Sequence, residues 1–102
     1  WYQNTRELAM MIIREQTLDL LELEGKFQDA AIVAFVLGKR AQKAENGKEA
    51  RRFGRKCLEL LGKYPTDTLE QCASPYLAFA DVFIPGLFHE GTVRRDFAPL
   101  VL

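Results

Sequence analysis

The segment from residue 50 to residue 64 has the clearest helical periodicity in the chain and constrains the fold most. Its small and apolar residues recur at spacings of three and four, which places them on one face of an α-helix. These positions are Ala50, Phe53, Gly54, Cys57, Leu58, Leu61 and Tyr64. Gly62 and Pro65 then supply a helix stop. The pattern predicts an amphipathic helix with Cys57, Leu58 and Leu61 in the interior.

The N-terminal segment predicts one continuous helix. Asn4 is a candidate N-cap with Glu7 three residues later, as in a capping box, and Gly25 is a candidate C-terminal stop. The apolar residues between them cover more than a single stripe, so we expect this helix to pack against two partners.

The next segment, residues 27–45, contains the apolar run AAIVAFVL. On its β-branched content alone this run could be a buried strand. Its alanines and the polar continuation KRAQKAE favour a helix, closed by Asn46-Gly47. Gly38 is expected to bend this helix or to admit a close neighbour.

Three short helices are predicted in the last third of the chain. Asp67 with Glu70 resembles a capping box that opens a helix to about residue 73, and Ser74-Pro75 resembles a helix start that continues to about residue 84. Another short helix is expected near residues 92–98. The fold class predicted for residues 1–102 is therefore a single all-α domain, a compact bundle of five or six helices, with stacked helical hairpins as one arrangement that fits the pattern.

Composition is that of a globular domain. The 102 residues are 48% hydrophobic and 27% charged, values at which wholesale disorder is not expected. The apolar run at residues 30–37 is far shorter than the roughly 20 residues of a membrane-spanning helix. The chain begins at Trp1 without an initiator Met, so we expect a domain excised from a longer protein, with no signal peptide in the part given.

The two cysteines, Cys57 and Cys72, both lie in apolar contexts, which favours buried free thiols over a disulfide or a reactive pair. An intracellular location, cytoplasmic or nuclear, is the corresponding expectation.

Motifs of enzymes are missing from the sequence. It has no phosphate-binding glycine loop, no dinucleotide fingerprint and no nucleophile elbow. His89-Glu90 is followed by Val93 where a zinc protease would have a second histidine. We therefore predict no enzyme activity, no cofactor and no metal site, and keep His89 as a general base as the weakest interpretation.

Charge is distributed unevenly along the chain. Residues 39–63 hold nine of the fourteen basic residues against three acids, whereas the segments before and after each carry a net charge of −3. A basic band between acidic flanks is either a docking surface for an anionic partner or a solvated helix face balanced by its neighbours.

The candidate partner-binding residues of this band are Lys48, Arg51, Arg52, Arg55, Lys56 and Lys63. A row of cations on one helix could follow phosphates or meet an acidic protein. The exposed face lacks interleaved aromatic residues and outward Asn, Gln or Ser, which favours the protein partner. A nucleic-acid-binding domain using helix 48–63 remains the alternative.

Aromatic residues near the two ends of the chain form a second, apolar candidate surface: Trp1, Tyr2, Phe88 and Phe97. Surplus aromatic surface marks a protein interface, although a well-filled core explains it equally well. The leading hypothesis is a non-enzymatic helical module for protein–protein interaction and scaffolding, with self-association as a homodimer in view and no membrane partner.

Overall fold

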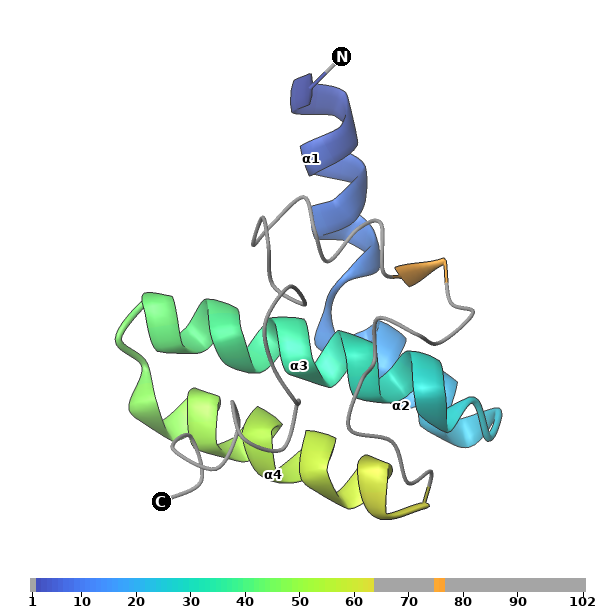
Figure 1. Ribbon diagram of the computed structural model, residues 1–102. Helices are drawn as coiled ribbons and strands as arrows, with labels where there is room; N and C mark the ends of the chain where they lie inside the picture. The colour runs from blue at the N-terminus through green and yellow to red at the C-terminus, as the bar shows by residue number, and fades with distance from the viewer. Residues whose placement is uncertain (1, 64–74, 77–102) are drawn as a thin grey trace, which may run out of the picture.

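The computed structural model describes residues 2–63 and 75–76, with side chains described for residues 7–60, 75 and 76. This part of the chain is all-α, as predicted (Figure 1). The helices are α1 (Tyr2–Ile12), α2 (Glu15–Leu23), α3 (Phe27–Lys43) and α4 (Gly47–Lys63). The three helices predicted beyond residue 64, and with them a total of five or six, lie outside the described residues.

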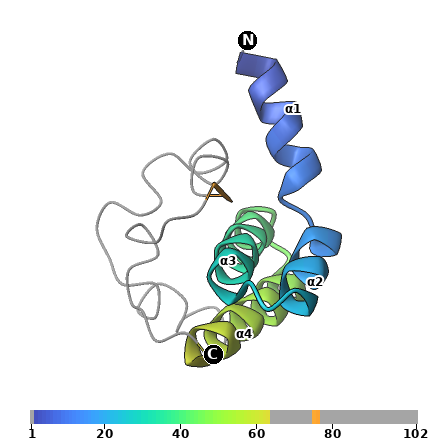
Figure 2. The same cartoon turned by 90° about the vertical axis from the view of Figure 1, so that its right-hand side faces the viewer.

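Helices α2, α3 and α4 pack as a group, from which α1 projects. Helices α3 and α4 run antiparallel side by side as a helical hairpin, and α2 lies against α3 (Figures 1 and 2). Seen nearly end-on in Figure 2, the three helices form a triangle, and α1 extends away from it. The basic helix α4 is therefore next to the acidic helix α2.

Helix α3 is the centre of the core. All residues from Ala30 to Val36 are buried, each with an exposed fraction of 1% or less. A helix that is apolar on every side is stable only when it is covered on every side. This burial explains why the run lacks an amphipathic pattern. The choice between strand and helix is resolved by the backbone, which is α-helical from Phe27 to Lys43.

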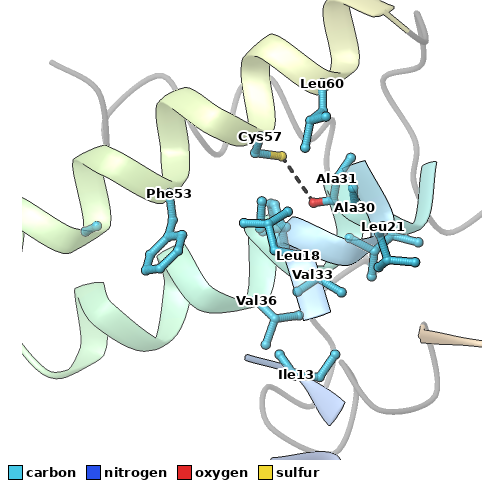
Figure 3. Packing of buried hydrophobic residues seen from close by; sticks show 14 residues of the cluster. Ile13, Leu18, Leu21, Ala30, Ala31, Val33, Val36, Phe53, Cys57 and Leu60 are labelled. Carbon is cyan, nitrogen blue, oxygen red and sulfur yellow. Dashed lines mark hydrogen bonds between the residues drawn. The ribbon is translucent and has the colours of Figure 1, made fainter. Parts of the chain in front are cut away.

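The buried face of α4 packs on α3 (Figure 3). Phe53, Cys57 and Leu60 are buried there, and the Cys57 thiol donates a hydrogen bond of 3.4 Å to the carbonyl oxygen of Ala31. Cys57 is thus a buried thiol, as predicted. Leu58, predicted to be interior, is partly buried against this core, and Leu60, which the pattern did not single out, is fully buried. The side chain of Leu61 is not among those described.

The prediction of one helix over residues 4–25 was wrong. Arg14 has an extended backbone, with φ −150° and ψ 169°, and separates α1 from α2. Ala9 and Leu18 are both buried, yet nine residues apart on a straight helix they would lie on opposite faces. The break allows both to be buried, and Arg40 donates a hydrogen bond of 3.3 Å to the Ile13 carbonyl there. Since α1 begins at Tyr2, Asn4 lies within the helix and is not its N-cap.

Gly25 ends α2, as predicted, through a Schellman motif. Its φ of 76° is left-handed, and it donates to the Glu22 carbonyl at 3.0 Å while Lys26 donates to Leu21 at 2.9 Å. These bonds satisfy carbonyls that the helix end would otherwise leave without partners.

Helix α3 ends in the same way, but a glutamate occupies the left-handed position. Glu45 has φ 59° and donates to the Gln42 carbonyl at 3.0 Å, while Asn46 donates to Ala41 at 2.9 Å. The predicted stop at Asn46-Gly47 was placed one residue too late, because the left-handed residue that ends α3 is Glu45. Gly47 is the first residue of α4, and the Asn46 side chain accepts the Glu49 backbone N–H at 3.2 Å as an N-cap.

The two left-handed positions predict opposite effects of substitution. Glu45→Gly should stabilise the protein by about 1 kcal/mol, because glycine adopts this conformation without strain. Gly25→Ala should destabilise the protein by a similar amount, because alanine is strained at the left-handed φ of residue 25. A steric clash does not add to this cost, since a Cβ there meets no atom within 4 Å. Urea unfolding of both variants measures the two changes. A loss of stability in Glu45→Gly would contradict the assignment of a strained helix end.

Burial of Cys57 predicts slow thiol chemistry. In the native protein its alkylation should be slower by at least about 100-fold than in urea, because the thiol reacts only after local or global opening. Peptide mass spectrometry after timed alkylation reports Cys57 separately from Cys72. Equal rates in native and unfolded protein would place the thiol outside the core.

Candidate interaction surface on helix α4

The outer face of α4 carries the predicted basic residues and forms a surface depression of about 390 Å³. Among the described residues its lining consists of Lys48, Arg51, Arg52, Arg55, Lys56 and Glu59. At about 100° per residue, these cations divide between two edges of the helix. Arg52 and Lys56 lie on the edge beside α2, whereas Arg51 and Arg55 lie on the other edge.

Arg52 links α4 to the start of α2. Its Nη1 and Nη2 donate to the two carboxylate oxygens of Glu15 at 2.6 and 3.1 Å. Its Nε and Nη2 also donate to Glu49, one turn earlier on α4, at 3.2 and 2.6 Å. The guanidinium lies 4.4 Å from the centre of the Phe53 ring, within cation–π range. Two carboxylates and a ring therefore fix this side chain.

These contacts change the acidity of the groups involved. Hydrogen bonds from Arg52 lower the pKa of Glu15 and of Glu49. The same bonds raise the pKa of Arg52 further above its ordinary value. All three groups are therefore charged at neutral pH.

Lys56 makes a second link between α4 and α2. Its Nζ lies 3.1 Å from a carboxylate oxygen of Glu22 and 3.9 Å from one of Glu59. The bond to Glu22 raises the pKa of Lys56. Two of the six predicted basic residues are thus neutralised by acids of the same chain, as the balanced-face interpretation of the band expects.

Three cations of the depression remain on the surface without such neutralisation: Lys48, Arg51 and Arg55. All three are exposed, and within residues 7–60 and 75–76 the structure gives none of them an ion pair. We call these three residues the free basic row. Their spacing of three and four residues along α4 gives a row about 10 Å long.

The other predicted contact residues are not brought to this surface by the described part of the chain. Lys63 is the last residue of α4 and Tyr2 the first of α1, and neither side chain is described. Trp1, Phe88 and Phe97 lie outside the described residues. The sequence did not single out the exposed apolar side chains of α1 and α2, which are Leu8, Met10, Met11, Leu20 and Leu23.

Comparison with protein-family models, curated proteins and solved structures finds no match to this chain. Across residues 2–63 and 75–76, no helix combines the length and apolarity needed to cross a membrane. In the same residues, no three His, Cys, Asp or Glu side chains are grouped so that they could hold a metal ion.

The link between Arg52 and Glu15 predicts a measurable coupling. A double-mutant cycle of Arg52→Gln and Glu15→Gln should give about 0.5–1 kcal/mol, the upper part of the range for solvent-exposed pairs, because the pair is bidentate. The pKa of Glu15 is lowered in the folded state, so this stabilisation is present at neutral pH and is lost as the pH falls through that lowered value. In the acidic range, the free energy of unfolding of Arg52→Gln should therefore depend less on pH than that of the wild-type protein.

Urea unfolding at neutral and acidic pH measures both the coupling energy of the pair and the pH dependence of the stability. Zero coupling at neutral pH, or an unchanged acid dependence in Arg52→Gln, would show that Arg52 does not hold α2 against α4.

Proposed function

We propose that the protein is a non-enzymatic interaction module of five or six helices that binds an acidic surface of another protein. The free basic row, Lys48, Arg51 and Arg55, is the proposed contact. One observation supports this proposal: acids of α2 neutralise Arg52 and Lys56, while Lys48, Arg51 and Arg55 on the outer face of α4 remain exposed and have no ion pair within the described side chains.

The free basic row suits a protein partner better than a nucleic acid. Duplex DNA binding rests on many phosphate contacts, commonly about 6–10, and three cations supply few of them. Two acids of α2 lie next to α4: a carboxylate oxygen of Glu15 is 2.6 Å from Arg52, and one of Glu22 is 3.1 Å from Lys56. Their charge lowers the positive potential that a polyanion would meet.

The geometry of the row favours a helical partner. Cations three and four residues apart along one helix edge match carboxylates at the same spacing on a neighbouring helix. Such exposed contacts contribute mainly to association rate and specificity, so an apolar contact elsewhere is needed for tight binding. We therefore propose an acidic amphipathic helix as the partner element, and a scaffolding role in an assembly.

An intracellular setting is part of the proposal. The buried thiol of Cys57, which donates a hydrogen bond to the Ala31 carbonyl, fits a compartment in which thiols stay reduced.

Charge reversal tests this function. Arg51→Glu/Arg55→Glu should abolish binding of a fluorescent helical peptide with glutamate at every third or fourth position, measured by anisotropy. The control Lys26→Glu/Lys43→Glu changes the net charge equally but lies off the outer face of α4, and it should retain most of the binding. Circular dichroism should show both variants folded, because exposed charges contribute little to stability.

A random-sequence DNA duplex is the opposing probe. Micromolar, salt-sensitive binding of the duplex that Arg51→Glu/Arg55→Glu removes would overturn the proposal in favour of nucleic acid. Equal loss of peptide binding in both reversal variants would show that net charge, rather than the free basic row, determines binding.

A further inference from the structure

The cations of the free basic row are crowded on one side of α4. Arg51 and Arg55 are four residues or about 6 Å apart along the axis, and Lys48 lies one turn before Arg51. Like charges at such spacings destabilise a helix. The same spacing occurs on the other edge at Arg52 and Lys56, where carboxylates of α2 offset the repulsion. Among the described side chains, no carboxylate lies within ion-pair distance of the free basic row to do the same.

Arg51 and Arg55 are able to turn toward a ligand, unlike Arg52. Four hydrogen bonds to two carboxylates hold the Arg52 guanidinium in place. Arg51 lies back over the first turn of α4, where its Nη1 is 3.3 Å from the position that a Cβ on Gly47 would take. Exposed side chains change rotamer within nanoseconds. The two exposed arginines can therefore both point at one group that is bound between them.

Arg52 shows how much anion a single guanidinium holds on this helix. It donates to both oxygens of the Glu15 carboxylate, at 2.6 and 3.1 Å, and donates to Glu49 as well. Two guanidinium groups together supply about ten N–H donors, more than one carboxylate accepts. A phosphate monoester carries close to two negative charges at neutral pH and has three acceptor oxygens, which the planar guanidinium fork binds in pairs. A pair of arginines one turn apart therefore matches a phosphate better than a carboxylate.

We infer that the free basic row recognises a phosphorylated side chain, a phosphoserine or phosphothreonine on the acidic helix of the protein partner. Arg51 and Arg55 hold the phosphate from two sides, and Lys48 adds a third positive charge. Glu59 lines the same depression one turn beyond Arg55, so the phosphate lies toward the Lys48 end, away from that carboxylate. This inference rests on the proposed function and adds regulation to it, because phosphorylation of the partner then switches binding on.

Three versions of the fluorescent glutamate peptide test the inference with the 102-residue chain. Their central residue is glutamate, serine or phosphoserine, and the rest of the peptide is the same. Measured by anisotropy, the phosphoserine peptide should bind at least about tenfold more tightly than either of the others, because the phosphate adds charge-assisted hydrogen bonds. In Arg51→Lys/Arg55→Lys this preference should fall to within about threefold, because lysine keeps the charge but lacks the fork. The control Arg14→Lys changes an exposed arginine that lies off α4 and should keep the full preference.

Failure of this inference is distinguishable from failure of the proposed function. Equal binding of the glutamate and phosphoserine peptides would overturn the inference and leave the proposed function standing, whereas failure of all three peptides to bind would overturn both. A preference that survives in Arg51→Lys/Arg55→Lys would place the phosphate elsewhere and overturn the inference. Tighter binding of phosphoinositide vesicles than of the phosphoserine peptide would also overturn it, in favour of a membrane.

Discussion

The burial of α3 on every side is the constraint on which the described fold depends. Residues 30–36 leave no exposed edge, and α2 and α4 both pack on this helix. Full burial of a large apolar side chain such as Phe35 or Ile32 contributes about 1.5–3 kcal/mol, whereas an exposed ion pair contributes about 0.2–1 kcal/mol. Packing therefore sets the arrangement of the helices, and the ion pairs between α2 and α4 act within it.

The electrostatic character of α4 follows from that packing. Because α2 lies along one edge, its acids meet the cations on that edge, where the Arg52–Glu15 pair is bidentate and Lys56 meets Glu22. The far edge of the same helix keeps its positive charge. The five basic residues of α4 from Lys48 to Lys56 are thus divided, in the folded protein, into two neutralised cations and a short row of three with a defined position and spacing. That row, and not the basic composition of the segment, is the basis of the proposed function.

Local sequence signals correctly predicted those helices and helix ends that depend only on residues close together in the sequence. The periodicity of residues 50–64 and the stop at Gly25 were sufficient for α4 and for the end of α2. The break at Arg14 was not predictable in this way. It allows Ala9 and Leu18, which would lie on opposite faces of one straight helix, to be buried together, and that requirement comes from the tertiary packing. Glu45 was missed because glycine, rather than glutamate, is the usual residue at a left-handed helix end. The division of the basic band depends on which helix packs beside α4, and periodicity within one segment carries no information about that neighbour.

The proposed contact surface depends on the difference between Arg52 and the arginines of the far edge, Arg51 and Arg55, and NMR of the arginine side chains measures this difference. Hydrogen bonding to Glu15 and Glu49 should protect the Nε–H of Arg52 from exchange with water and hinder rotation of its guanidinium. Arg51 and Arg55 should exchange rapidly and rotate freely. Arg52 should therefore give a distinct, slowly exchanging signal that disappears in Glu15→Gln/Glu49→Gln. Equal exchange for all three arginines would contradict the division of α4 into a neutralised edge and a free basic row.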